Sequence, residues 1–139
     1  MNNTDDNKYI FNIKTVQSGA FRILIESLKE ILTDTNIIFD KTLIKLIATD
    51  NSQIVLIHMK LHAENFEYFY CEKKTTIGIN MMNMFKLIKT MNNNDTLTLF
   101  IEKENPNRLG IKINNIEKNT QTLFKNGRNI NKKNKKKEN

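Results

Sequence analysis

The sequence predicts an α+β domain in which an antiparallel sheet carries two amphipathic helices on one of its faces. Several short segments alternate between apolar and polar residues, with the period of two that is typical of half-buried strands. Two other segments change to the period of 3.6 that is typical of an amphipathic helix. With 139 residues, the chain is long enough for one domain with a hydrophobic core, since domains of about 100–150 residues are the commonest.

The first strand and the first helix follow each other near the start of the domain. Tyr9–Val16 alternates as a strand, with Tyr9, Phe11 and Ile13 on one face. Ser18 is a suitable N-cap for the helix that follows, because its hydroxyl can accept a hydrogen bond from a backbone N–H of the first turn. The apolar stripe of this helix consists of Phe21, Leu24, Ile25, Leu28 and Leu32. The opposite stripe consists of Arg22, Glu26 and Lys29.

The rest of the domain consists of short strands and one more helix. Before that helix, strands are predicted at Thr35–Asp40, Ile44–Thr49, Gln53–His62, Glu67–Cys71 and Thr75–Asn80. Asn80 is the predicted N-cap of the helix, and Lys86 and Lys89 lie on its polar side. Its apolar stripe consists of Met81, Met84, Phe85 and Ile88. Further strands are predicted at Thr96–Glu102, Arg108–Ile113 and Thr120–Lys125. The order β-α-β-β-β-β-β-α-β-β-β indicates an antiparallel α+β domain with both helices on one sheet face.

The two ends of the chain differ in composition from the domain, which is assigned to residues 9–125. Residues 1–8 are polar and are predicted to be disordered. Residues 126–139 hold six cations against one carboxylate and account for +5 of the net charge of +7. This basic segment has too few apolar side chains to offset its ordering entropy, so it is predicted to be a disordered tail. A solubilising tail, a nonspecific phosphate-binding arm and a nuclear-import signal all fit its composition.

Several classes of protein are excluded by what the sequence contains. No apolar run approaches the ~20 residues that a membrane-spanning helix needs, and the first residues do not form a secretory signal. The single cysteine, Cys71, cannot form a disulfide within the chain and is predicted to be a small buried hydrophobe. The protein is therefore expected to be intracellular, not secreted, and to have no membrane partner.

Nothing in the sequence indicates catalysis, a cofactor or a metal site. His58 and His62 would lie about 13 Å apart along a strand, too far to share a metal ion. The four glycines do not form a phosphate-binding loop. The chain is therefore predicted not to be an enzyme.

A set of short motifs, taken in order, resembles a known family. These motifs are Ala48-Thr49-Asp50-Asn51-Ser52, Phe66 with Tyr68, Tyr70-Cys71, Ile77-Gly78-Ile79-Asn80 and Lys86-Leu87-Ile88-Lys89. Together they are similar to the N-terminal domain of the DNA sliding clamp family, PCNA (proliferating cell nuclear antigen). The resemblance runs from about Phe11 to Lys125 without large gaps.

The resemblance implies a DNA polymerase processivity factor that encircles duplex DNA during replication. Its helices would line the central hole of a ring and contact phosphates, which carry no sequence information. The DNA-binding residues implied by position are Arg22, Lys29, Lys86 and Lys89. The expected partners are duplex DNA, a DNA polymerase and a clamp loader. The expected location is the nucleus or a viral DNA replication compartment.

The chain departs from the family because a clamp subunit of the eukaryotic type has two such domains joined by a connector. The resemblance therefore implies a half-length or truncated subunit, which forms a ring as a homo-oligomer or pairs with another clamp subunit. The partner groove would be at most half present, and its expected residues are Asp50, Ser52, Gln53 and Ile54. The expected subunit interface is formed by Thr120, Thr122 and Phe124.

An alternative function is a small basic α+β module that binds RNA or single strands without forming a ring. Such modules stack bases on exposed aromatic side chains. Tyr68 and Tyr70 share one strand face and are the candidate platform, whereas Phe21, Phe66 and Phe85 fall on faces expected to be buried. The clamp function is the preferred prediction for this reason.

Overall fold

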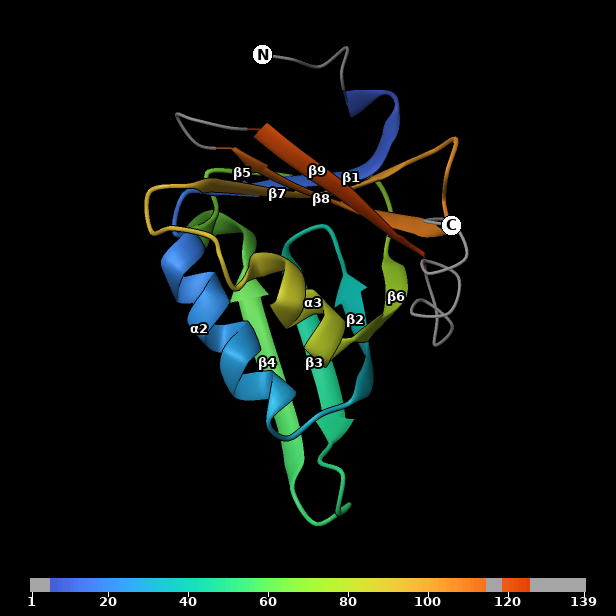
Figure 1. The fold of residues 1–139 in the computed structure, drawn as a ribbon. Coiled ribbons are helices and arrows are strands. Elements are labelled where there is room, and N and C mark those ends of the chain that lie inside the picture. Colours follow the sequence, from blue (N-terminus) through green and yellow to red (C-terminus); the bar gives the residue numbers. More distant parts are fainter. Residues whose placement is uncertain (1–5, 115–118, 126–139) are drawn as a thin grey trace, which may run out of the picture.

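The computed structural model describes residues 6–114 and 119–125, the latter as a strand backbone. Figure 1 shows the elements along the chain. Their order is β1 (Tyr9–Thr15), α2 (Ser18–Lys29), β2 (Asp34–Phe39), β3 (Leu43–Thr49), β4 (Leu56–His62), the 3-10 helix η1 (Ala63–Asn65), β5 (Tyr68–Cys71), β6 (Thr75–Asn80), α3 (Met81–Ile88), β7 (Thr96–Glu102), β8 (Arg108–Asn114) and β9 (Asn119–Lys125). Each of the predicted strands and helices is present, so the predicted α+β class is confirmed.

The strands form two antiparallel sheets rather than one. The five-stranded sheet has the order β5-β1-β7-β8-β9, and the four-stranded sheet has the order β4-β3-β2-β6. β1 lies between β5 and β7, which both follow it much later in the chain. Apolar alternation shows which residues of a strand are buried, but it does not show which strands are neighbours. The division into two sheets therefore became visible only in the folded chain.

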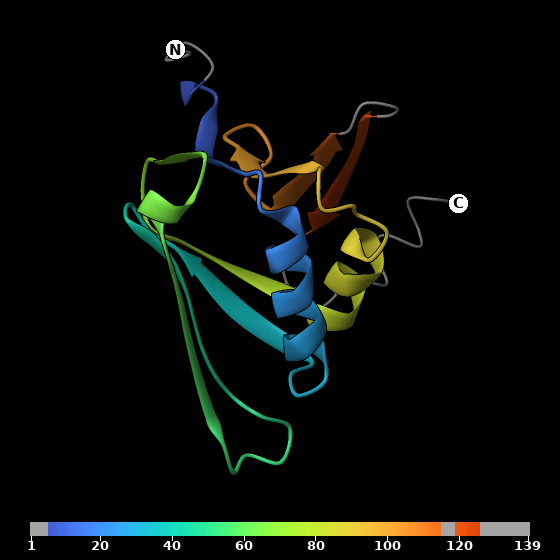
Figure 2. The same cartoon turned by 90° about the vertical axis from the view of Figure 1, so that its left-hand side faces the viewer.

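The two helices lie side by side, below the five-stranded sheet and beside the four-stranded sheet, and share one core with both sheets (Figure 2). Ile25 and Leu28 of α2 and Met84 of α3 are buried against this core. At its centre, the rings of Phe11 and Phe39 stack at 4.1 Å with an angle of 14° between them. Because Phe11 belongs to β1 and Phe39 to β2, this contact joins the two sheets. Burying a phenylalanine side chain contributes about 1.5–3 kcal/mol.

The two helices begin differently. Asn80 caps α3 as predicted, since its side chain accepts a hydrogen bond from the N–H of Asn83 at 3.0 Å. The prediction for α2 was wrong, because Gln17 occupies the N-cap position and makes no side-chain capping bond. Ser18 is instead the first helical residue, and its buried hydroxyl donates to the carbonyl of Asn92 at 2.8 Å. This bond fixes the start of α2 to the loop that follows α3.

The start of the described chain is held against the five-stranded sheet. Asp6 is buried, and its carboxylate accepts a hydrogen bond from the hydroxyl of Tyr68. The carbonyl of Lys8 accepts the N–H of Lys103 at 2.9 Å. Both residues belong to the segment 1–8 that was predicted to be disordered. The remainder of that segment, residues 1–5, and the predicted basic tail, residues 126–139, lie outside the described residues.

Position 110 of β8 must be a glycine, because the Phe100 ring occupies the space that a side chain there would need. The Phe100 ring, from the neighbouring strand β7, is 4% exposed and lies directly over Gly110. A Cβ atom on Gly110 would lie 2.2 to 2.5 Å from three carbon atoms of that ring. A buried ring cannot turn aside without loss of packing, so this position accepts no side chain.

We expect Gly110→Ala to lower the free energy of unfolding by about 1–3 kcal/mol, the usual cost of overpacking. In a Phe100→Ala background the same change should become favourable, because alanine loses less conformational freedom than glycine in a strand. Urea unfolding of the two single variants and the double variant measures this coupling. An equal penalty in both backgrounds would contradict the contact.

Candidate nucleic-acid interface

The outward side of α3 presents free cations. Lys86 and Lys89 are exposed, and Met82 is the exposed apolar residue of this helix. Both lysines lie at the C-terminal end of α3, where the helix dipole favours positive charge. The prediction that these two residues lie on a solvent-facing side of the helix is confirmed.

Lys29 of α2 is less accessible than its helical position predicted. Its side chain is only 14% exposed, and its Nζ lies 2.5 Å from Oε2 of Glu30. The same ammonium lies 4.8 Å from the centre of the Phe85 ring of α3. The hydrogen bond from Lys29 and its charge lower the pKa of Glu30 below the ordinary value. Lys29 therefore links α2 to α3 and has its charge partly neutralised.

Arg22 is held at the other end of α2. Its Nη2 lies 3.5 Å from Oδ1 of Asn93, and its Nε is buried without a hydrogen-bond partner among the described residues. Gly19 makes room for this arrangement, because a Cβ there would lie 2.2 Å from Oδ1 of Asn93. The guanidinium therefore lies next to the α3–β7 loop and is only partly accessible.

The exposed face of α2 differs from the stripe that periodicity predicted. Its residues are Ala20, Ile23, Glu26 and Ser27, followed by Glu30 and Ile31 in the turn after the helix. Ile23 is 58% exposed, and no cation belongs to this group. The helix layer as a whole, residues 18–31 and 81–89, has four cations against two carboxylates. Its accessible positive charge is concentrated on α3 and at Arg22.

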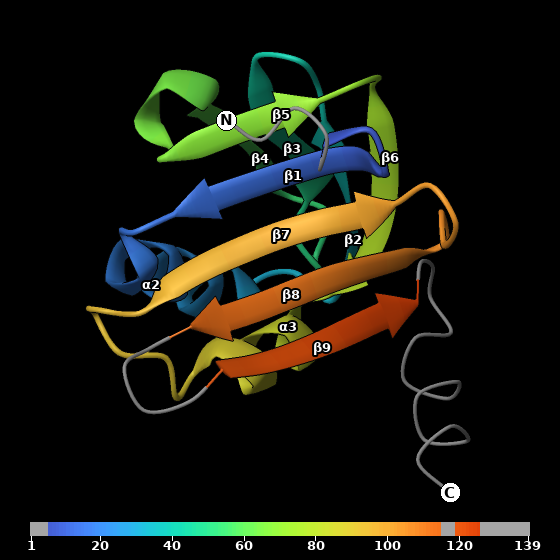
Figure 3. The ribbon, with the colours of Figure 1, turned by 90° about the horizontal axis from the view of Figure 1, so that it is seen from above.

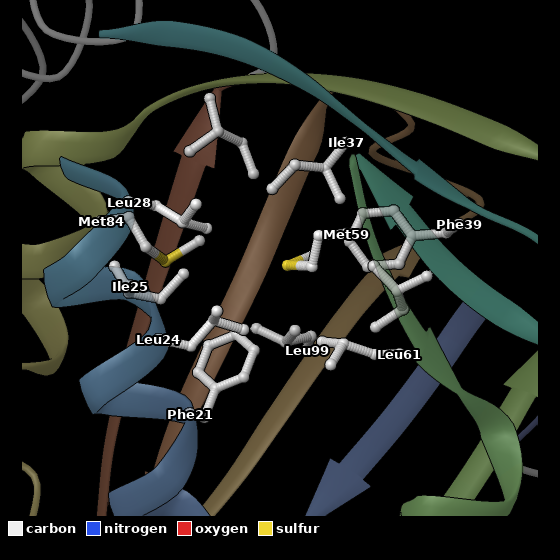
Figure 4. A pocket seen from close by; sticks show the side chains of 12 residues that line it. Phe21, Leu24, Ile25, Leu28, Ile37, Phe39, Met59, Leu61, Met84 and Leu99 are labelled. Atoms are coloured by element: carbon white, nitrogen blue, oxygen red, sulfur yellow. The ribbon is translucent and has the colours of Figure 1, made fainter. Parts of the chain in front are cut away.

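Beneath α2 lies a cavity that is too small to be a ligand site. Its volume is about 20 Å³, which is close to the minimum for a single water molecule. Figure 4 shows that its walls are apolar side chains from α2, α3 and both sheets, including Phe21, Phe39 and Met84. We regard it as a packing defect of the core.

The predicted partner groove coincides with the loop that joins β3 to β4. The carboxylate of Asp50 accepts the N–H groups of Ile54 and Val55 at 2.9 and 3.0 Å, and the hydroxyl of Ser52 at 2.7 Å. These bonds lower the pKa of Asp50 below its ordinary value, with the Val55 N–H as the largest cause. Gln53 adopts a positive φ of 65°. For these reasons β4 begins at Leu56, three residues later than predicted.

Several apolar side chains are exposed on this hairpin, which projects away from the body of the domain (Figures 1 and 2). Ile54 is 82% exposed and Leu56 is 67% exposed. Val55 and Ile47 are also exposed, as is Ile31 in the turn after α2. The loop reaches α2 through the N–H of Asn51, which donates to the carbonyl of Ile31 at 3.2 Å. Val55, Leu56 and Ile47 were missed from the sequence, because alternation on a strand does not show whether either face is covered.

β9 forms one edge of the five-stranded sheet. It pairs with β8 along its whole length, from Asn119 opposite Asn114 to Lys125 opposite Arg108. The predicted interface residues Thr120, Thr122 and Phe124 lie on this strand, but their side chains are outside the described residues. β4 forms an edge of the other sheet and is exposed at alternate residues throughout.

The described residues offer no cluster for catalysis by a metal or a thiol. No group of three His, Cys, Asp or Glu among them could hold a metal ion. Cys71 is buried as predicted, and its thiol donates to the carbonyl of Lys73 at 3.2 Å. Burial raises the pKa of this thiol, which disfavours the reactive thiolate. No helix in the described part of the chain is long and apolar enough to span a membrane.

Two neighbouring helices placed on two antiparallel sheets, with cations on the outward side of the helices, define a domain of the DNA sliding clamp class. Residues 10–131 match the family described as "Proliferating cell nuclear antigen, N-terminal domain". The chain belongs to this family. The family is non-enzymatic, in agreement with the prediction that the chain is not an enzyme.

Individual relatives agree with this assignment. The chain is 37% identical, over 86% of its length, to the "Probable DNA polymerase sliding clamp 1" of Paramecium bursaria Chlorella virus 1, of which it covers 46%. It is 31% identical, over 68% of its length, to the proliferating cell nuclear antigen of Caenorhabditis elegans, of which it covers 36%. The chain thus spans less than half the length of these two relatives.

The fold also matches a solved structure. The crystal structure of PCNA from Thermococcus kodakaraensis superposes with a TM-score of 0.79 at 23% sequence identity, over 85% of this chain and 47% of that chain. The predicted clamp-like fold is therefore confirmed.

The loop around Asp50 should lose its order in acid. Because the folded state lowers the pKa of this carboxyl, the bonds to Ile54 and Val55 are complete above the ordinary aspartate pKa of about 3.9. They are lost as the pH falls through the lowered pKa. We expect the amide resonances of both residues to shift together with Asp50 in an NMR titration. In Asp50→Asn, which keeps an acceptor oxygen and does not titrate, the shifts should be absent; their persistence would assign them to another group.

Proposed function

We propose that the chain is a DNA polymerase processivity factor, a sliding clamp domain that holds duplex DNA through phosphate contacts during replication. The observation that carries this proposal is the helix layer, where Lys86 and Lys89 are exposed on the outward side of α3 and Arg22 is half-buried beside them on α2. Family membership supports it. Such contacts give affinity without reading sequence, which suits a protein that must move along DNA.

The four DNA-binding residues should not contribute equally. Lys86 and Lys89 are exposed and form no ion pair with the residues that the structure describes, whereas Lys29 is already bonded to Glu30 and covered by Phe85. Moving Lys29 to a phosphate would break both contacts. We therefore assign the main phosphate contacts to α3, with Arg22 as a third contact beside Asn93.

We further propose that the domain assembles through its sheet edges. A ring made of single clamp domains needs two different edges on each copy, because a head-to-tail contact joins unlike surfaces. β9, with Thr120, Thr122 and Phe124, supplies one edge, and β4 is suitable as the other because it is exposed along its length. The assembly would be a homo-oligomer of about six copies, or this chain would pair with another clamp subunit.

The hairpin surface is the proposed contact for protein partners. A DNA polymerase and a clamp loader are the partners that family membership suggests, in the nucleus or in a viral DNA replication compartment. Exposed apolar side chains at Ile54 and Leu56 favour a partner that contributes an apolar segment. Asp50, Ser52 and Gln53 shape the loop that presents them.

Removal of the free cations on α3 should weaken duplex binding specifically. For Lys86→Ala/Lys89→Ala we expect the slope of log affinity against log salt concentration to fall by about 1.8, at about 0.9 for each phosphate that is no longer neutralised. The melting temperature should change little, since both side chains are exposed. Fluorescence anisotropy with a labelled duplex at several salt concentrations measures the slope.

The matched control is Lys41→Ala/Lys74→Ala, which removes the same charge from exposed lysines in loops outside the helix layer and the proposed assembly edges. It should lower the slope much less. An equal decrease in the two double variants would mean that the net charge, rather than the helix layer, carries duplex binding, and would contradict the proposal.

The native mass tests assembly. Light scattering during gel filtration at near-physiological salt should give a closed species of about six times the 16.3 kDa chain mass. The physical reason is that β4 and β9 are edges of the sheets formed by the described strands, and an edge strand presents backbone groups that can pair with another chain. A stable monomer would contradict self-assembly and leave pairing with another clamp subunit as the route to a ring.

A further inference from the structure

The five-stranded sheet has a second face, which is turned away from the helices (Figure 3). Its inner face carries core residues such as Phe11 and Ile101. The residues between them along each strand therefore point outward. β5, β1, β7 and β8 contribute side chains to this outward face, which the proposed clamp function does not use.

Strand register places cations and an aromatic ring in one row across this outward face. Tyr68 of β5 lies opposite Lys14 of β1, Lys14 lies opposite Thr98 of β7, and Thr98 lies opposite Lys112 of β8. Lys14 is exposed, Tyr68 is 37% exposed and Lys112 is half-buried, whereas Thr98, between the two lysines, is buried. Two strand spacings of about 4.8 Å separate the backbones at the two lysines. The row therefore has a ring at one end and two ammonium groups along it.

The neighbouring row supports these side chains. Nζ of Lys112 lies 5.8 Å from the centre of the Phe100 ring, which is fixed over Gly110. Tyr9 packs edge-on against the same ring, with 5.6 Å between centroids. At the other end of the first row, which holds Lys14 and Lys112, the hydroxyl of Tyr68 donates a hydrogen bond to Asp6, and this bond holds the ring in place. The cations and the Tyr68 ring are thus presented by a rigid sheet.

We propose that this outward face, called here the outer row (Lys14, Tyr68, Thr98 and Lys112), binds single-stranded nucleic acid. A base would stack on the Tyr68 ring, and adjacent phosphates would contact Lys14 and Lys112. Stacking of this kind needs an unpaired base, because the bases of a duplex are covered by their neighbours. The charge complementarity of the two lysines with a phosphate backbone, together with the exposed ring, favours this ligand over an acidic peptide.

Acidic groups on the same face set the limits of the site. Asp6 lies beside Tyr68, and Glu102 lies opposite Tyr9, away from the outer row. The site therefore extends from Tyr68 toward Lys112 rather than toward Glu102. The outer row lies on the opposite side of the five-stranded sheet from the helices, so it can bind a single strand while the helix layer holds a duplex.

Anisotropy with a labelled oligo-dT of about 16 nucleotides, near the upper site size of one small binding domain, tests the proposal in the full chain. For Lys14→Ala/Lys112→Ala we expect the salt slope to fall by about 1.4, at about 0.7 for each phosphate of a single strand that is no longer neutralised. Tyr68→Leu should weaken binding by about fivefold or more, and the conservative Tyr68→Phe should restore most of that affinity because it keeps the ring. Thermal unfolding of each variant verifies the fold.

Matched controls separate the outer row from general charge. Lys41→Ala/Lys74→Ala, which removes two exposed loop lysines, should leave oligo-dT binding nearly unchanged. Equal decreases in the two lysine pairs, or equal affinities for Tyr68→Leu and Tyr68→Phe, would overturn the proposal. Competition by a polyglutamate peptide as effective as that by unlabelled oligo-dT would also overturn it and indicate an acidic protein as the partner.

The helix-layer variants distinguish this site from the proposed clamp function. Lys86→Ala/Lys89→Ala should lower duplex affinity and leave oligo-dT affinity unchanged. If duplex binding is insensitive to these changes while oligo-dT binding depends on Lys14 and Lys112, the clamp proposal fails and the outer row stands. The reverse result overturns the outer row alone.

Discussion

The core shared by the two sheets is the constraint on which the other features depend. Phe11 and Phe39 stack at 4.1 Å across the boundary between the sheets, and the buried stripes of α2 and α3 complete the same core. Because protein cores are close-packed, the helices cannot rotate about their axes without opening voids. The packing therefore decides which side chains of α2 and α3 reach solvent, and with them the charge of the candidate DNA surface.

A consequence is that helical periodicity and accessibility differ on α2. Lys29 lies on the polar side of the helix, yet it faces α3 and contacts Glu30 and Phe85. Cations at the border between two helices serve packing as well as charge, since their alkyl stems cover apolar surface. Exposed Ile23 then occupies the outward position. The charge of the helix layer is thus carried mainly by the shorter helix.

The two faces of the five-stranded sheet show how one scaffold can separate two surfaces. One face contributes buried residues to the core beneath the helices, while the other presents Lys14, Tyr68 and Lys112. The strand period of two makes this division automatic, because each successive side chain changes face. On this outward face the Phe100 ring fills the space over Gly110, which has no side chain of its own.

The sequence by itself determined the elements, the clamp-like class, the cap at Asn80, the burial of Cys71 and the exposure of Lys86 and Lys89. These features depend on the local periodicity of apolar residues and on short motifs, and both can be read from the order of residues along the chain. Only the tertiary structure decided the two-sheet arrangement, the partial burial of Arg22 and Lys29, the loop around Asp50 and the outer row. Each of these depends on which distant segments become neighbours, and that is set by packing of the whole core rather than by local preference.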